Sequence, residues 1–128
     1  MLEKPFNKDI IENLLHNFRL TKYETDVYLT LLMHGPQNYK GLLKLSGVPL
    51  GKIYYIINSL DLKGWVKSID EKPRIFYTVN PEEPIKNHLI EIKKQINNLE
   101  ESSQQIMPQL QNLYDHSHKS LFNNRVRS

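Results

Sequence analysis

The side chains best suited to binding chemistry lie close together near the middle of the chain. Lys52 and Asn58 carry groups that can hydrogen-bond to the edges of guanine and adenine. Tyr54 and Tyr55, which lie between them, could contact a phosphate or pack against the methyl group of thymine. Gly51 precedes them and, like them, falls outside the apolar stripe of this segment. This combination favours a surface that reads duplex DNA.

Basic residues on both sides of this stretch are suited to phosphate contacts. They are Lys40, Lys44, Lys72 and Arg74, and the arginine could also enter a narrow minor groove. Residues 38–79 contain seven basic and three acidic residues, whereas residues 81–128 contain six of each. The positive charge is therefore concentrated around the suspected binding surface. The alternative is an ordinary solvated surface.

Some residues in this region have simpler interpretations. Tyr54 or Tyr55 could belong partly to the core or to a dimer contact rather than to a DNA-binding surface. Lys63 and Lys67 are interpreted as solubilising charges. These alternatives stay open at the level of the sequence.

The surrounding residues predict a helix-turn-helix. A short helix is expected over 39–45, followed by a tight turn at Ser46-Gly47, where glycine can adopt a positive φ. A second helix is expected over 49–63, ended by Gly64. Its apolar residues follow the i, i+3, i+4, i+7 rule and are Ile53, Ile56, Ile57 and Leu60. In this motif the second helix enters the major groove and the first braces it.

A two-stranded wing is expected next. Residues 65–69 and 75–79 are rich in β-branched and aromatic side chains, which favours strands. The polar segment 70–74 between them is typical of a hairpin tip. The predicted fold class is thus mainly α with a small β-hairpin, a winged helix-turn-helix.

Two further helices are expected before this motif. Residues 8–18 have one apolar stripe at helical spacing. A new helix starts at Thr21, because Thr21 and Glu24 have the spacing of a capping box, and it ends at Gly35-Pro36. Its predicted buried face consists of Tyr23, Val27, Tyr28, Leu31 and Leu32.

A long coiled-coil helix is expected after the wing. Apolar residues are spaced alternately by four and three positions over four heptads, with Ser103 as the single polar member. We expect this stripe to pair two copies of the chain, with packing inside one chain as the alternative. The predicted dimerisation residues are Ile85, Leu89, Ile92, Ile96, Leu99, Ile106, Leu110 and Leu113. Because isoleucine recurs at d and leucine mostly at a, an antiparallel or four-helix arrangement is possible.

These patterns divide the chain into three parts. The predicted DNA-binding domain covers residues 1–80, the dimerisation helix 81–115, and a flexible tail without periodicity 116–128. Pro108 removes one hydrogen bond and clashes one turn back, so a kink or break is expected near Gln104.

Other classes of protein find little support. The chain has no cysteine, and no apolar run approaches the roughly 18 residues needed to span a bilayer. We therefore expect a cytoplasmic protein without a membrane partner. The histidines lack carboxylates at metal-ligand spacing, and no serine lies in a nucleophile elbow. We expect no enzyme activity, metal or cofactor.

Three segments, in the right order, resemble a known family. They are LTKYETDVYLTLLMHGP (residues 20–36), LLKLSGVPLGKIYYIINSLDLKGWV (residues 42–66) and KPRIFYTVNPEEPI (residues 72–85). Together they resemble the N-terminal part of the TrmB-like archaeal transcriptional regulators. Those are winged-helix proteins in which a strand ending in a proline-acid-acid turn leads into a long coiled-coil dimer helix. The resemblance implies a homodimeric, archaeal DNA-binding regulator associated with the nucleoid.

The chain departs from that family in two respects. Members usually carry a basic and a small polar residue after the turn proline, where this chain has Leu50 and Gly51. The resemblance covers residues 20–113 and not the sugar-binding domain of full-length members, so it does not imply sugar sensing here. The main hypothesis is a transcriptional regulator that reads DNA with helix 49–63 and wing 70–74. The alternatives are an architectural, chromatin-like DNA binder of low specificity and a protein-interaction adaptor.

Overall fold

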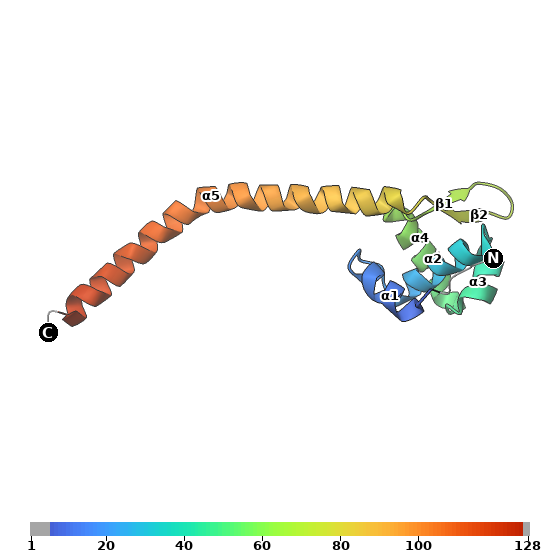
Figure 1. Cartoon of the computed structure of the whole chain (residues 1–128), viewed down its shortest axis with the longest axis horizontal. Coiled ribbons are helices and arrows are strands. Elements are labelled where there is room, and N and C mark those ends of the chain that lie inside the picture. Colours follow the sequence, from blue (N-terminus) through green and yellow to red (C-terminus); the bar gives the residue numbers. More distant parts are fainter. Residues whose placement is uncertain (1–5, 127–128) are drawn as a thin grey trace. The chain divides into compact units, whose positions relative to one another are not determined.

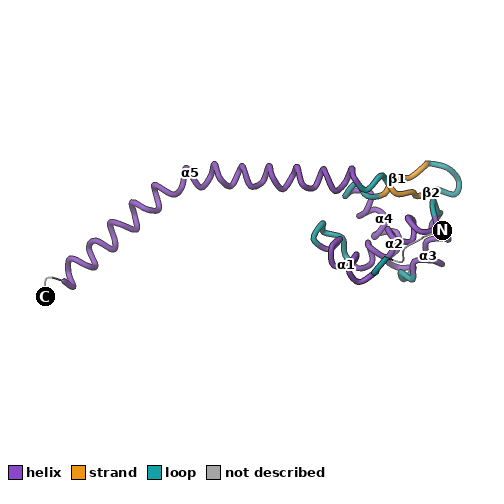
Figure 2. The backbone as a smooth tube through the Cα atoms, viewed as in Figure 1, coloured by secondary structure: helices purple, strands orange, loops and turns teal. Residues whose placement is uncertain are grey.

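A computed structural model describes residues 6–126, which form helices and one small sheet (Figures 1 and 2). In chain order the elements are α1 (Lys8–His16), α2 (Lys22–His34), α3 (Tyr39–Ser46), α4 (Leu50–Leu62), β1 (Val66–Ile69), β2 (Ile75–Thr78) and α5 (Glu82–Val126). The chain forms two compact units, divided between His88 and Leu89 within α5. The predicted winged helix-turn-helix is confirmed, and each expected element lies within a few residues of its predicted place.

The core of the first unit lies between α2, α3, α4 and the hairpin. Val27, Leu42, Ile53 and Leu60 are almost completely buried there. The four apolar residues predicted for the inner face of α4 are all buried, as their spacing requires. Leu32 is the exception to the prediction for α2, because 46% of it is exposed. It lies on the edge of the apolar stripe, and the described residues leave that edge partly open to solvent.

Local sequence signals define the ends of these helices. Thr21 caps α2: its hydroxyl accepts a hydrogen bond from the backbone N–H of Glu24, and Glu24 in turn accepts one from the N–H of Thr21. The capping box is therefore confirmed. Gly47, at φ 75°, makes the turn between α3 and α4. This left-handed conformation suits glycine, which has no Cβ to clash.

The hairpin is tied to the start of α3. β1 and β2 pair antiparallel, with Val66 opposite Thr78 and Ile69 opposite Ile75. Gln37, just before α3, exchanges two backbone hydrogen bonds with Phe76 of β2, of 3.0 and 2.8 Å. These two hydrogen bonds fix the wing next to the helix-turn-helix, in addition to its covalent connections to α4 and α5.

Helix α1 closes one side of the first unit. Phe18, just after it, packs edge-on against Trp65, which also contacts Tyr28. Ile10 and Leu14 of the predicted apolar stripe are more than half exposed, so only part of that stripe faces the core.

Helix α5 runs from Glu82 to Val126. It contains Pro108 and bends in its orange part without breaking (Figure 1). A bend is the outcome expected of a proline inside a helix. The helix continues beyond residue 115, where the sequence placed the end of the dimerisation helix.

The first five residues of the predicted domain 1–80 and the last two of the predicted tail 116–128 lie outside the described residues. Within the described part of the chain, the helices are too short or too polar to cross a membrane.

A buried carboxylate links α2 to the end of α4. Glu24 is only 1% exposed, and its second oxygen accepts a hydrogen bond of 2.7 Å from the hydroxyl of Ser59. Its first oxygen accepts one of 2.8 Å from Nζ of Lys63, which also donates to the carbonyl of Arg19. The interpretation of Lys63 as a solubilising charge is therefore wrong, because its ammonium group neutralises a buried acid from another helix.

Replacement of Lys63 should destabilise the fold. In Lys63→Met the carboxylate of Glu24 stays buried without its cation, so we expect the free energy of unfolding to fall by about 2 kcal/mol. Lys67→Met, at an exposed lysine of β1, is the matched control and should change it by less than about 0.5 kcal/mol. Urea denaturation followed by the fluorescence of Trp65 measures both, and equal effects would contradict the proposed role of Lys63.

The same carboxylate should make stability depend on pH. Burial alone would raise the pKa of Glu24, but hydrogen bonds from Lys63, Ser59 and Thr21 outweigh it and hold the pKa below the ordinary value of 4.5. The stabilisation is therefore fully present above about pH 4.5 and is lost as the pH falls through the lower pKa of the folded state. Urea denaturation between pH 7 and pH 3 should show this loss, and Glu24→Gln should lack it. A Glu24→Gln protein that loses stability in parallel with the original chain would refute the assignment.

Candidate nucleic-acid interface

The outer face of α4 is the exposed surface that the helix-turn-helix offers. Because an α-helix turns 100° per residue, Gly51, Tyr55, Asn58 and Leu62 form a stripe opposite the buried isoleucines. All four are exposed, with Tyr55 at 74% and Leu62 at 90%. The core fixes which way α4 is rotated, and so it fixes which side chains a ligand would meet.

The first residue of this stripe, Gly51, has no side chain. At Gly51 a Cβ atom would meet nothing within 4 Å, and the backbone of Gly51 does not have a positive φ. The fold therefore does not require glycine here. A glycine at the first turn of an exposed helix allows a ligand to approach the backbone closely.

The two neighbouring tyrosines differ in their surroundings. The ring of Tyr54 packs on Tyr39 of α3, with 4.1 Å between ring centroids, and Tyr39 packs on Phe76 of β2 at 4.6 Å. Tyr54 thus joins an aromatic cluster of Tyr54, Tyr39 and Phe76, which connects α4, α3 and the wing. Tyr54 is nevertheless 53% exposed. It therefore belongs partly to this cluster and partly to the surface, in line with the alternative raised from the sequence. Tyr55 has no aromatic ring partner among the described residues.

Lys52 lies on the other flank of α4. Its Nζ is 6.0 Å from the centroid of the Tyr23 ring, at the outer limit of a cation–π contact. Lys52 is exposed and can still turn toward a phosphate. Its position is beside the outer stripe rather than in its centre.

The remaining predicted residues are exposed on α3 and on the hairpin tip. Lys40 and Lys44 lie on α3. Lys72 and Arg74 lie in the wing, where Nη2 of Arg74 is 3.9 Å from Oδ1 of Asp70. Such an exposed pair is weak and leaves the guanidinium free to exchange partners. The aromatic cluster joins α3 and β2 to α4, so these exposed basic side chains belong to elements that pack next to α4.

Sequence reasoning missed Leu62 as an exposed apolar residue of α4, whereas it had identified Leu50 as an uncharged position at the start of the helix. Leu50 and Leu62 are 63% and 90% exposed. The signal was available for Leu62, which follows Asn58 by four residues and therefore lies on the same outer stripe. Among the described residues, no group of three or more metal-binding side chains comes together.

The different surroundings of the two tyrosines predict different mutational effects. Tyr54→Ala removes a ring that packs on Tyr39, so the free energy of unfolding should fall by about 1–2 kcal/mol. Tyr55→Ala, its neighbour and control, removes an exposed ring and should change it by less than about 0.5 kcal/mol. Thermal or urea denaturation measures both. If Tyr55→Ala proves the more destabilising, the placement of the two rings is incorrect.

Solved structures show the same fold. The chain superposes on TrmBL2, described as an archaeal chromatin protein with a novel mode of DNA binding, with a TM-score of 0.76 at 23% identity, covering 89% of this chain and 46% of that one. It superposes on the transcriptional regulator Tm0710 from Thermotoga maritima with a TM-score of 0.51 at 20% identity, covering 87% of each chain. At these identities the likeness establishes the winged-helix fold.

Sequence comparison defines the family. The chain is 44% identical over 79 residues to TrmBL1, a sugar-sensing transcriptional regulator of Pyrococcus furiosus, and covers 23% of its length. It is 31% identical over 93 residues to the Bacillus subtilis protein YrhO, covering 73% of this chain and 34% of the relative. The chain thus spans between 23% and 34% of the length of these relatives. The family model for the sugar-specific transcriptional regulator TrmB matches residues 14–82, more than half of the chain. This chain belongs to the TrmB family of transcriptional regulators.

Proposed function

We propose that this protein is a dimeric transcriptional regulator that reads duplex DNA with the helix 49–63 and the wing 70–74. The observation that carries the proposal is the outer stripe of α4, which is exposed and held in one rotation by the core. The neighbouring α3 and the wing carry exposed basic residues. A helix presented in this way fits the major groove, while its neighbours reach the backbone. Family membership supports the same function.

The residues divide by the DNA groups that they can contact. Asn58 and Tyr55, in the centre of the stripe, are placed for base edges, and Lys52 and Tyr54 for the margins of the groove. Gly51 allows the start of α4 to approach the DNA. The phosphate contacts fall to Lys40, Lys44, Lys72 and Arg74.

The working unit is a homodimer formed through α5. Leucines and isoleucines at heptad spacing are exposed along this helix, and such a stripe is stable in water only when it is covered. The proposed seam consists of the eight predicted residues Ile85, Leu89, Ile92, Ile96, Leu99, Ile106, Leu110 and Leu113. Ile85 differs from the others because it is partly buried against the core of the first unit, so it stands at the end of the seam. Domain 1–80 would bind DNA, helix 81–115 would pair, and segment 116–128 would be a tail. A regulator of this kind acts in the cytoplasm, on the nucleoid.

An architectural role is the second candidate. Leu50 and Gly51 place no charge at the start of α4, which limits the number of contacts that discriminate between bases. TrmBL2, which shares the fold, is described as a chromatin protein. Equal affinity for random DNA and for DNA selected from a random pool would favour this role over specific regulation.

Gel shifts over a range of salt concentrations test DNA binding itself. If a dimer makes about six phosphate contacts, its affinity should fall about a thousandfold between 50 and 200 mM salt. A duplex selected from a random pool is the probe, and a scrambled duplex of equal length is the control. The absence of binding to either duplex at low salt would refute the proposed function.

Substitutions should separate positioning contacts from base reading. Arg74→Ala should weaken binding to all sequences alike and flatten the salt dependence, because it removes a phosphate contact. Asn58→Ala should weaken binding to the selected duplex by about 5- to 150-fold and relax the preference at one position, the effect of losing a base contact of about 1–3 kcal/mol. Asn97→Ala, at an exposed asparagine of α5, is the control and should have no effect. Loss of sequence preference in Arg74→Ala and not in Asn58→Ala would contradict these roles.

A further inference from the structure

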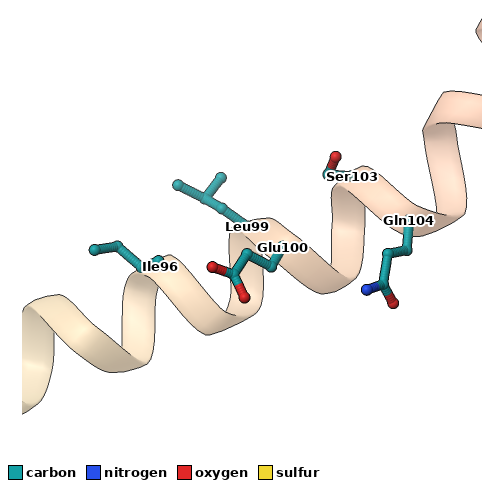
Figure 3. Close-up of a pocket in the computed structure, with 5 residues that line it drawn as sticks. All are labelled: Ile96, Leu99, Glu100, Ser103 and Gln104. Atoms are coloured by element: carbon teal, nitrogen blue, oxygen red, sulfur yellow. The ribbon is translucent and has the colours of Figure 1, made fainter.

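The second unit presents an uncovered apolar seam. Leu89, Ile96 and Ile106 are close to half exposed and Leu99 is 69% exposed. Figure 3 shows Ile96, Leu99 and Ser103 pointing from the same side of the helix, with Glu100 beside them. These four residues, together with Gln104, line a shallow hollow on the helix surface. The seam has the heptad spacing of a paired helix, and its occupant in the proposed homodimer is a second copy of α5.

We propose that the two copies of α5 pair in antiparallel orientation, with Ile96 of each copy opposite Leu99 of the other. The inference rests on the homodimer of the proposed function and specifies its orientation and register. In an antiparallel pair each a residue faces a d residue. Between Leu89 and Ile106 this register creates three kinds of layer, each present twice: Ile96 with Leu99, Ile92 with Ser103, and Leu89 with Ile106. Further out, the same register places Ile85 opposite Leu110.

Charge complementarity selects this register. Lys93 follows Ile92 and therefore occupies the interval between the Ile92 and Ile96 layers, and Glu100 occupies the matching interval on the other copy, between Leu99 and Ser103. The symmetry of the dimer thus creates two Lys93–Glu100 pairs. A shift of one heptad in one direction would place Lys93 opposite Lys93, and a shift in the other direction would place Glu100 opposite Glu100. Like charges at these positions oppose pairing.

A parallel pair lacks these advantages. It would place Lys93 beside His88 and Glu100 beside Gln95, with no ion pair at either position. It would also bring Ser103 opposite itself. Leucine at a with isoleucine at d, the pattern of Leu89 and Ile92, disfavours a parallel two-stranded coil. Three independent features of the seam therefore favour the antiparallel orientation.

The proline itself lies outside the proposed seam. Pro108 occupies heptad position f, the position farthest from the seam. The bend it causes is expected near Gln104 and so falls between the Ser103 and Ile106 layers of each copy. The four central layers, formed by Ile92, Ile96, Leu99 and Ser103 of the two copies, lie between the two bends.

Cysteine cross-linking tests the orientation, because the chain has no cysteine of its own. In the full-length chain, Ile92→Cys combined with Ser103→Cys should give a disulfide-linked dimer under mild oxidation, since the two positions face each other. The single variants Ile92→Cys and Ser103→Cys should remain uncross-linked at the same protein concentration. Cross-linking of either single variant would establish a parallel pair and overturn the proposal. A double variant that stays dimeric without cross-linking would overturn the register.

A charge exchange tests the register without changing the apolar seam. Lys93→Glu and Glu100→Lys should each weaken dimerisation by about 3- to 10-fold, because each creates two like-charged contacts. The double variant should return the dissociation constant to within about twofold of the original. Analytical ultracentrifugation at low salt measures all four proteins, and a double variant no tighter than the single variants would overturn the proposal. A mass of four chains would overturn the pairing of two helices. A monomeric mass for the unsubstituted chain would refute the homodimer itself. In that case the gel shifts would still test DNA binding separately.

Discussion

The burial of one side of α4 is the constraint on which the rest of the first unit depends. Ile53, Ile57 and Leu60 are almost fully excluded from water, and α4 packs on both α2 and α3. Removing such side chains from water contributes about 1.5–3 kcal/mol each, so a rotation of α4 that exposed them would be strongly unfavourable. Tyr55 and Asn58 lie opposite these buried residues around the helix axis. The same burial therefore determines that they face outward. The proposed binding surface is thus a consequence of the core.

Polar and aromatic contacts hold the ends of this arrangement. The carboxylate of Glu24 caps α2 and also binds Ser59 and Lys63, so it fixes the C-terminal part of α4 against the start of α2. At the other side, Tyr39 lies between Tyr54 and Phe76 and connects α4 to the wing. A rigid frame of this kind suits a protein that recognises a partner by the position of a few side chains, because little ordering remains to occur on binding.

The second unit is governed by a different physical rule. A single helix with a narrow apolar stripe cannot cover that stripe by itself, and the exposed residues of α5 remain in contact with water until another helix packs on them. The composition of the seam also determines which orientation of the two helices is favoured. The places of leucine, isoleucine, Lys93 and Glu100 favour one orientation over another, since each orientation brings different residues together. In the proposed function, DNA binding and dimerisation thus depend on separate units of one chain.

Much of this organisation follows from the sequence by itself. The local signals are the apolar spacing of residues 53–60, the glycine after α3, the capping box at Thr21, and the β-branched and aromatic residues of the two strands. These signals suffice to predict the elements and the winged-helix fold. The exposure of Asn58 and Tyr55 also follows from helical periodicity. The bend at Pro108 could be anticipated because a proline acts on the helix that contains it.

Only the tertiary structure decided how residues distant in the sequence combine. Glu24 and Lys63 are 39 residues apart, and no local pattern distinguishes Lys63, which binds a buried acid, from Lys67, which faces solvent. The same holds for Tyr54 and Tyr55, whose difference arises from the ring of Tyr39 on another helix. The sequence shows which surfaces of each element are apolar or polar. Burial and pairing depend on which of these surfaces meet in space. Only the packing of the elements against one another determines that.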